Sequence, residues 1–416
     1  MDSHKPSLAD KLKALGVKVG TADLTPASDS SKAGAAIPIH RVVPGAFHNT
    51  ARGAAFVSEQ SFGPDYRHGA QPLSINHSLD TIALWARSPQ MSSFPLSSFL
   101  FLDTETSGMA GGTGTYAFLV GVGRYNGDAF ELAQFFMRDP SEEPAMLEAL
   151  LEFLAPARSL VTFNGKAFDA PLLNTRYALH SIPSPIKDIA HLDLLPLARR
   201  LWRDRLPSRA LKYLEENILG LPRTAEEVPG YEIPWLYFDY LRTGDATPLK
   251  GVFYHNAMDV VAMAALLSHV AAIFHDPYSG TVEHGLDFIA LGKFYEDLRQ
   301  WDKAARLFEH GLTHELTEAD FGAAVERLSH LQKRRGDLEE AIRLWEQAAT
   351  QGHIYAHVEL AKYHEHRQRD YAVALAWTEA ALELVKISDQ PAYIKKHWKD
   401  DLSHRKERLK QKRRRE

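Results

Sequence analysis

The chain has no cysteine among its 416 residues. Disulfide bonds and cysteine-ligated zinc are therefore excluded, and the composition suits a reducing compartment. Residues 1–6 lack the apolar core of a signal peptide, and no run approaches the roughly 18 consecutive apolar residues of a membrane helix. We therefore expect a cytoplasmic protein without a membrane partner.

Neither polarity nor charge is extreme. Hydrophobic residues make up 45% of the chain, charged residues 24%, and the formal net charge is −5. These values are typical of a folded globular protein, and the length exceeds that of one typical core. More than one domain is expected.

The N-terminal part of the chain carries little chemistry. A short helix within residues 8–15 and a linker rich in Ser, Ala, Asp and Pro are expected across residues 1–37. Residues 38–95 are expected to form an extension that packs on the following domain. Their histidines have no tight ligand spacing, so we predict no zinc site from His48, His68 and His77.

A pair of carboxylates follows the first strongly apolar run, residues 98–102. Asp103 and Glu105 are two residues apart, so on a strand they point to the same face. Neighbouring carboxylates repel each other unless a cation lies between them, and their hard oxygen atoms suit Mg²⁺ or Mn²⁺. Taken alone, the tripeptide can equally be a solvated strand end.

A third carboxylate follows the next apolar run, residues 160–163. Asp169 begins a predicted helix that has a proline in its first turn. Its simplest role is to cap that helix. Asn164 and Lys166 precede it in a loop, where a lysine is more often only solvated.

The last carboxylate lies on a predicted helix spanning residues 249–267. At about 100° per residue, His255 and Asp259 lie within about 40° of each other on one face. Tyr254 points about 140° away from Asp259, so His255 is the better partner. By itself, His255–Asp259 can be a surface pair that contributes only a few tenths of a kcal/mol.

Together, these motifs resemble the three exonuclease motifs of the DEDD (DnaQ-like) superfamily. The similarity is closer to its YprB-like ribonuclease H-like branch and covers roughly residues 95–270. It rests on three stretches, residues 101–108, 111–121 and 255–259. The resemblance implies an α/β ribonuclease H-like domain over residues 96–275, with a mixed sheet and flanking helices.

The resemblance also implies a site. Two Mg²⁺ or Mn²⁺ ions would be held by Asp103, Glu105, Asp169 and Asp259, with His255 as general base. Asn164, Lys166 and Thr106 would contact the substrate.

The third motif departs from the wider superfamily. That superfamily places a histidine five residues, or a tyrosine four residues, before the final aspartate. Here His255 is four residues and Tyr254 five residues before Asp259, as in the YprB-like pattern. The general base therefore stays open between His255 and Tyr254, since a helix beginning after Tyr254 would let its ring turn inward.

The segments between the acidic motifs predict a mixed α/β domain. The glycine-rich residues 108–115 lack the phosphate-loop pattern and are expected to form a turn. Strands at residues 116–124 and 130–137 are joined by an Asn126-Gly127 hairpin, and a helix spans residues 142–154.

Two further signals precede the third motif. Asp193 ends an apolar stretch, and we expect it to have a structural or capping role, although it can also assist the site. Ser208 is expected to cap a helix that follows it.

Residues 283–387 have no strand signals and contain a degenerate helical repeat. Segments beginning at Trp301, Leu338 and Tyr371 align at spacings of 37 and 33 residues. The period and the small alanine in each unit resemble tetratricopeptide repeats, which form a scaffold for a protein partner. A plain helical bundle is the alternative.

The C-terminal residues 388–416 are predicted to be a basic tail. From Lys395 onward the chain has eleven Lys or Arg against four Asp or Glu. Such a tail can bind nucleic-acid phosphates or simply be a solvated helix end.

These features favour a two-metal-ion nuclease, a 3′–5′ exonuclease on single-stranded DNA or RNA. Its polarity comes only from the resemblance. One alternative is a structure-selective endonuclease using the same site. Another is a non-catalytic scaffold that binds nucleic acid or protein, although the presence of all four carboxylates argues against it.

Overall fold

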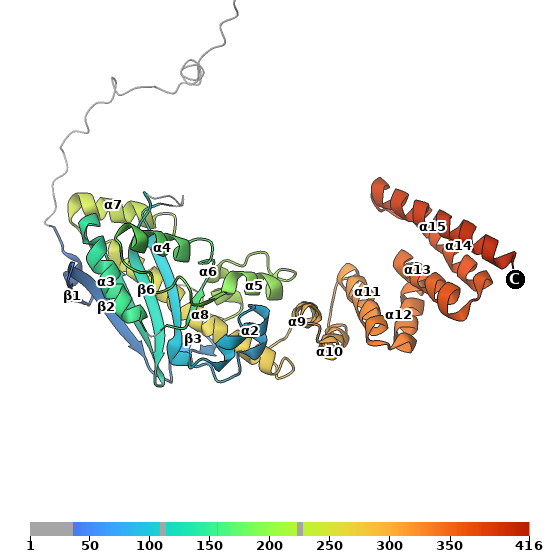
Figure 1. Cartoon of the computed structure of the whole chain (residues 1–416), viewed down its shortest axis with the longest axis horizontal. Coiled ribbons are helices and arrows are strands. Elements are labelled where there is room, and N and C mark those ends of the chain that lie inside the picture. The colour runs from blue at the N-terminus through green and yellow to red at the C-terminus, as the bar shows by residue number, and fades with distance from the viewer. Residues whose placement is uncertain (1–35, 109–113, 156, 223–227, 416) are drawn as a thin grey trace, which may run out of the picture.

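The computed structural model describes residues 36–108, 114–155, 157–222 and 228–415. The helix expected at residues 8–15, nearly all of the linker and residues 109–113 of the glycine-rich stretch lie outside them. An α/β body is followed by a curved row of helices (Figure 1).

One seven-stranded mixed sheet forms the centre of the body, in the order β1-β2-β7-β6-β5-β8-β9. From β1 to β5 all neighbours are antiparallel, whereas β8 and β9 run parallel to β5. The expected ribonuclease H-like sheet is confirmed. The strands are β1 (Ala46–Thr50), β2 (Gly53–Phe62), β5 (Phe99–Thr106), β6 (Ala117–Asn126), β7 (Ala129–Phe136), β8 (Ser159–Thr162) and β9 (Ala190–Asp193).

The segment before residue 95 contributes to this sheet directly. Strand β2 pairs with β7, so β1 and β2 extend the sheet rather than only packing on it. The small β3 (Arg67–His68) and β4 (Gln71–Pro72) follow. There His68 and Glu215 form an ion pair or hydrogen bond at 2.6 Å, with both side chains fully buried. This contact fastens the segment to the body.

The β6–β7 hairpin turns one residue later than predicted. Asn126 pairs with Ala129, so Gly127 and Asp128 form the two-residue loop. Gly127 has a φ of 58°, a conformation that glycine adopts without strain. The turn is therefore placed by the glycine and not by the Asn-Gly pair.

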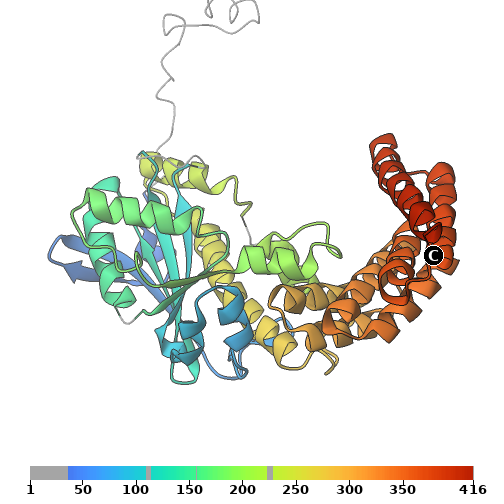
Figure 2. The same cartoon turned by 45° about the vertical axis from the view of Figure 1, so that its right-hand side comes forward.

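Successive side chains of β5 point to opposite faces of the sheet and therefore belong to two different parts of the hydrophobic core. Phe99 and Phe101 belong to one buried cluster together with the middle of α8, whereas Leu100 and Leu102 belong to another. Helices α3 (Glu143–Leu154), α4 (Asp169–Leu179) and α7 (Ile233–Thr243) supply the second cluster. The sheet thus lies between two helical layers (Figure 2).

Helix α8 (Leu249–His275) is the longest element of the body. By length and composition it could cross a membrane, contrary to the expectation that no segment comes close. However, 83% of its most apolar window is buried inside the protein. Its low polarity reflects a helix surrounded by core, packed on β5 and β6.

Shorter helices complete the first layer: α2 (Asp80–Trp85), α5 (Leu194–Trp202) and α6 (Leu211–Asn217). The prediction that Ser208 caps α6 is wrong. Ala210 occupies the N-cap position, and Ser208 Oγ accepts a hydrogen bond from the Ala210 amide at 3.2 Å. The serine therefore forms a tight turn just before the helix.

The C-terminal third, called here the helical arm, consists of helices joined by short connections. The three aligned segments begin α10, α12 and α14, and Ala304, Ala341 and Ala374 are fully buried at equivalent positions. The arm comprises α9 (Gly285–Asp297), α10 (Trp301–Gly311), α11 (Glu318–Arg335), α12 (Leu338–Thr350), α13 (Ile354–Tyr363), the π-helical η5 (His364–Gln368), α14 (Tyr371–Ile387) and α15 (Ala392–Arg413).

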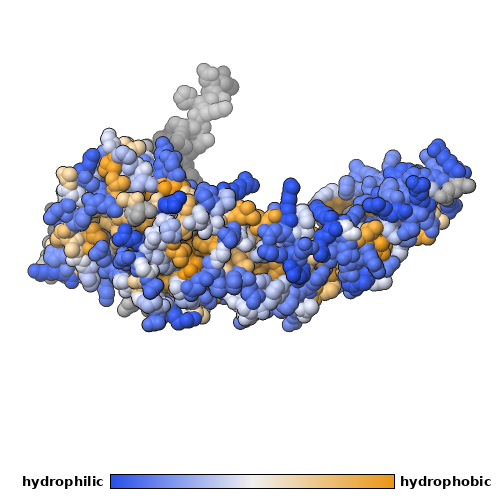
Figure 3. Space-filling model, turned by 60° about the horizontal axis from the view of Figure 1, so that its bottom comes forward, coloured by the Kyte–Doolittle hydropathy of each residue, from blue (hydrophilic) through white to orange (hydrophobic). Residues whose placement is uncertain are grey.

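Most of the basic C-terminal segment is helix α15, which packs along α14. Leu402 and Leu409 are fully buried, which anchors the helix despite its charge. Towards this free end the arm's surface is strongly hydrophilic on the face shown in Figure 3.

Candidate active site

The carboxyl end of β5 directs two acidic side chains towards helix α8. Asp103 Oδ2 accepts a hydrogen bond from Asn256 Nδ2 at 2.9 Å, and Glu105 Oε1 lies 3.9 Å from His255 Nε2. The pairing register with β6 shifts between Glu105 and Thr106. Such bulges redirect side chains at the end of a strand.

A buried amide network fixes Asp103. Asp103 pairs with Gly121 on β6, and Gly121 pairs with Gln134 on β7, so the three form a row across the sheet. Asn256 lies over Gly121: a Cβ at that glycine would be 2.2 Å from Asn256 Oδ1. Gln134 Nε2 donates to Asn256 Oδ1 at 2.9 Å and to the Phe253 carbonyl at 2.8 Å. Sequence reasoning missed Asn256 and Gln134, whose role depends on cross-strand register.

Asp169 approaches the same region from the opposite layer. It lies in the first turn of α4, and Phe168 occupies the N-cap position, so Asp169 is not the cap. Its Oδ1 accepts a hydrogen bond of 2.5 Å from the Thr104 hydroxyl on β5. The carboxylate is therefore oriented by the strand that carries Asp103 and Glu105.

The loop from β8 to α4 is held by Asp193. Asp193 caps α5 through the Leu195 amide, as expected for a capping residue, and also accepts from the amides of Asn164 at 2.8 Å and Lys166 at 3.2 Å. Asn164 has a φ of 69°, and a Cβ at Gly165 would lie 2.8 Å from Asp169 Oδ2. The loop therefore passes close to Asp169, with Lys166 exposed.

Thr106 ends β5, and its hydroxyl donates to the Gly108 carbonyl at 2.9 Å. This hydrogen bond orders the chain just after the bulge. The side chain therefore already has a partner within the protein.

His255 and Asp259 both face the carboxylates of β5. Helix α8 begins at Leu249, before Tyr254, so the late helix start that would turn Tyr254 inward does not occur. His255 Nε2 lies 3.6 Å from Asp259 Oδ2, whereas Tyr254 lies near Tyr66. The expected geometry of the histidine and aspartate on one helix face is confirmed.

Burial and mutual repulsion act on the acidic group. Burial raises the pKa of Asp103 well above its usual range, and the charges of Asp259, Glu105 and Asp169 raise it further, against the hydrogen bond from Asn256. Burial also raises the pKa of Asp169 to about 6, against the hydrogen bond from Thr104. Four carboxylates from β5, α4 and α8 thus interact electrostatically.

This donor set fits a divalent cation. Carboxylate oxygens are the ligands that Mg²⁺ and Mn²⁺ prefer, and a cation would remove the repulsion that raises the pKa of Asp103. Across the described ranges, no three His, Asp or Glu side chains already stand at metal-cluster spacing.

The strand order of the sheet, with acidic residues supplied by β5, α4 and α8, defines a class of protein, the ribonuclease H superfamily. Residues 100–271 match the family model described as the RNase_H superfamily. The chain is also 33% identical, over 336 residues, to "Uncharacterized protein YprB" of Bacillus subtilis (strain 168), a match covering 78% of this chain and 80% of that protein. The protein therefore belongs to the YprB family within this superfamily, as the sequence motifs indicated.

The chain is also similar to a solved structure, that of the family B DNA polymerase from the hyperthermophilic archaeon Pyrobaculum calidifontis. That similarity has 16% sequence identity and a TM-score of 0.31, over 47% of this chain and 28% of the polymerase. Members of the superfamily are typically nucleic-acid hydrolases that generally use divalent metals.

Proposed function

We propose that this protein is a metal-dependent nuclease of the DEDD type, a 3′–5′ exonuclease that hydrolyses phosphodiester bonds of single-stranded DNA or RNA. One observation carries the proposal. The buried Asp103 interacts with carboxylates from three elements, an arrangement that is unfavourable without a cation.

In this proposal Asp103, Glu105, Asp169 and Asp259 hold two Mg²⁺ or Mn²⁺ ions. Such ions would neutralise charge on the attacking and leaving oxygens of an in-line displacement. Asn256 orients Asp103, and Thr104 orients Asp169. The hydrogen bond from Asn256 is made to Oδ2 of Asp103, so Oδ1 of this carboxylate remains for a ligand.

His255 is the proposed general base. Its Nε2 lies between Asp259 and Glu105, and an imidazole can accept a proton from the attacking water near neutral pH. The two carboxylates then stabilise the imidazolium that forms.

Asn164, Lys166 and Thr106 are the proposed substrate contacts. Asn164 and Lys166 lie on the loop that Asp193 holds beside Asp169. An exposed lysine there can pair with a backbone phosphate next to the cleaved bond. To contact the substrate, the Thr106 hydroxyl would have to give up its hydrogen bond to the Gly108 carbonyl.

The helical arm is proposed to be a tetratricopeptide-like scaffold for a protein partner or for the nucleic-acid strand. Its support is the sequential pairing of α9 with α10, α11 with α12, and α13 with α14. The buried alanines at equivalent positions in the second helix of each pair agree with this proposal.

The proposal is tested with 5′-labelled single-stranded DNA and RNA and with a circular strand, in Mg²⁺ or Mn²⁺. Wild type is compared with Asp103→Asn and with Asp239→Asn, a matched change at an exposed surface pair. Metal-dependent ladders in wild type and Asp239→Asn but not in Asp103→Asn, with the circle intact, would support the exonuclease. Cut circles would point to an endonuclease.

Binding of the metal can be measured without activity. Mn²⁺ should raise the melting temperature of wild type in proportion to RT ln(1 + [L]/Kd), and Asp259→Asn should reduce that rise. Equal rises in both proteins, together with nucleic-acid binding but no cleavage, would favour the scaffold.

A further inference from the structure

A second candidate site lies in the helical arm, far along the chain from the acidic residues. A cavity of about 470 Å³ is enclosed by residues of α11, α12, α13, η5 and α15. Its lining includes Lys333, Lys362, Arg367 and Arg405, with Trp345 and Tyr363 as aromatic walls. A volume of this size exceeds what a single ion requires and lies within the range of small-molecule sites.

Two buried donors of this lining have no acceptor. Trp345 is 1% exposed and Arg405 is 8% exposed. Neither Trp345 Nε1 nor Arg405 Nε has a hydrogen-bond partner among the residues that the structure describes. Buried donors are normally paired, and a ligand in this cavity is one source of the missing acceptors.

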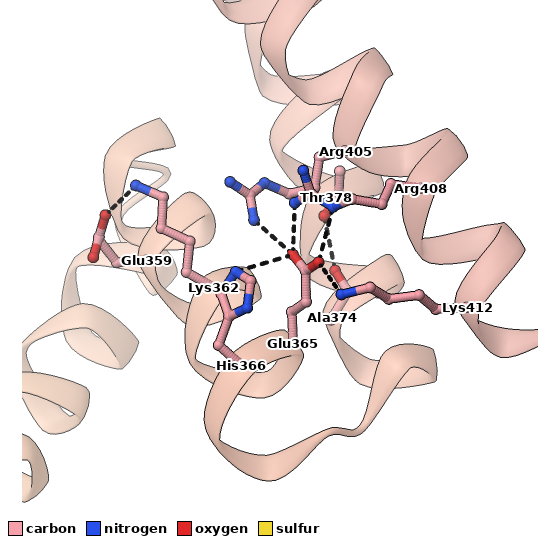
Figure 4. Close-up of polar contacts among 9 residues, drawn as sticks. All are labelled: Glu359, Lys362, Glu365, His366, Ala374, Thr378, Arg405, Arg408 and Lys412. Atoms are coloured by element: carbon pink, nitrogen blue, oxygen red, sulfur yellow. Dashed lines mark hydrogen bonds and ion pairs between the residues drawn. The ribbon is translucent and has the colours of Figure 1, made fainter. Parts of the chain in front are cut away.

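Arg405 is held in place from behind. Its Nη1 donates to the buried Glu365 at 2.8 Å, and Glu365 also accepts from Arg408 at 2.9 Å and from Lys412 at 3.0 Å (Figure 4). Three cations therefore share one carboxylate. Positive charge is therefore in excess around Glu365, and of these three cations Arg405 lines the cavity.

The π-helical turn η5 separates its consecutive side chains. Glu365 is directed to α15, whereas His366 and Arg367 line the cavity, although His366 Nε2 also lies 3.6 Å from Glu365 Oε2. Arg367 is exposed and has no ion-pair partner within the described ranges. Single π-helical turns of this kind frequently mark functional sites.

One carboxylate in the lining offsets part of this charge. Glu359 accepts hydrogen bonds from Lys333 at 2.7 Å and from Lys362 at 2.6 Å. One carboxylate thus serves two lysines and keeps them in place. With Arg367 and Arg405 added, the cavity remains positive.

We propose that this cavity binds a phosphate monoester, either the 5′-phosphate end of a nucleic-acid strand or a free 5′-nucleotide. The donors approach from several elements, and the tetrahedral phosphate offers more acceptor oxygens than a planar carboxylate. A monoester also carries about −1.5 to −2 charges at neutral pH, which matches the excess of cations. The choice between a strand end and a free nucleotide rests on the proposed nuclease function. The inference that the cavity binds a phosphate monoester does not.

The test uses the full-length protein in EDTA, so that metal-dependent cleavage cannot occur. Isothermal titration measures the binding of adenosine 5′-monophosphate and of inorganic phosphate, and the pocket variants assign that binding to the cavity. Fluorescence anisotropy compares 3′-labelled single strands that carry a 5′-phosphate or a 5′-hydroxyl. The two measurements distinguish a strand end from a free nucleotide.

The pocket variants are Lys333→Gln combined with Arg367→Gln, and Trp345→Phe, which removes the N–H but keeps an aromatic ring. The matched control combines Arg343→Gln with Lys386→Gln, two exposed cations outside the cavity. We expect roughly tenfold weaker phosphate binding in the double pocket variant, weaker binding in Trp345→Phe, and no change in the control. Circular dichroism checks that each variant is folded, and the double variant changes only exposed side-chain ends.

Tighter binding of the 5′-phosphorylated strand assigns the site to strand ends. Equal binding of both strands, with adenosine monophosphate still bound, assigns it to free nucleotides. No phosphate binding by wild type, or an equal loss of binding in the control, would overturn the proposal. None of these measurements depends on cleavage. A protein that binds phosphate but does not cleave would therefore refute only the proposed nuclease function. A protein that cleaves but does not bind phosphate would refute only this inference.

Discussion

Asn256 on α8 donates its side-chain amide to Asp103 on β5, 153 residues earlier in the chain, at 2.9 Å. The same amide accepts a hydrogen bond from Gln134. One buried side chain therefore joins the long helix to two strands at the acidic site.

Asn256→Ala should lower the free energy of unfolding by about 1–3 kcal/mol, because the Gln134 amide would lose one of its acceptors and Asp103 its donor. Urea unfolding measures the change. The control is Asn217→Ala, whose exposed amide bonds only the Tyr213 carbonyl. Equal stability of Asn256→Ala and wild type would show that the network contributes nothing.

Gly121→Ala should displace Asn256, since the new Cβ would lie 2.2 Å from its Oδ1. We expect a loss of stability of about 1–3 kcal/mol from this overpacking, with weaker cleavage. Gly63→Ala is the matched control, because a Cβ there meets nothing within 4 Å. Thermal unfolding and the cleavage assay report the two effects, and an unperturbed Gly121→Ala protein would contradict the close approach.

His255→Gln should lower kcat by roughly 10²–10⁴-fold, the usual contribution of a general base. Tyr254→Phe should retain activity, because that ring lies near Tyr66 and not beside the carboxylates. Steady-state cleavage rates of the two variants decide between the residues. A large loss in Tyr254→Phe alone would reverse the assignment.

The stability of the arm should depend on pH through Glu365. Burial raises the pKa of Glu365, but hydrogen bonds from Arg408 and Lys412 outweigh it and lower the pKa from 4.5 to about 2. The folded state thus binds this proton less readily than the unfolded state. The stabilisation is complete above pH 4.5 and is lost as the pH falls through 2.

Glu365→Gln tests this dependence. At pH 7 the variant should be less stable by about 2–3 kcal/mol, because charged hydrogen bonds are lost. The difference from wild type should shrink as the pH falls below 4.5. Urea unfolding at a series of pH values gives the comparison, and a constant difference would show that the carboxylate charge is not responsible.

Local patterns in the sequence were sufficient for most of the sheet. The apolar run before Asp103 predicts β5, and the period of two places Asp103 and Glu105 on one side, where both meet α8. The 3.6-residue period likewise places His255 beside Asp259. Each of these relations depends only on neighbours in the chain.

Relations between distant segments were not readable. Three contacts join segments that are far apart in the chain: the pairing of β2 with β7, the hydrogen bond from Asn256 to Asp103, and the hydrogen bond from Arg405 to Glu365. The basic C-terminal segment was expected to be a tail because its charge conceals the widely spaced Leu402 and Leu409. These contacts are decided by tertiary packing, which cannot be inferred from the composition of a segment.

The helical arm is attached to the α/β body through its first helix, α9. Helix α9 is fastened to the body by the ion pairs of Arg205 with Asp287 at 2.9 Å and Lys293 with Asp204 at 2.7 Å, and by Trp85 stacked on Phe294. Beyond α9, each helix packs mainly on the helix before it and the helix after it (Figure 2). Small rotations at successive contacts would add up along such a row, so we expect the position of α15 relative to the acidic site to vary more than that of α9.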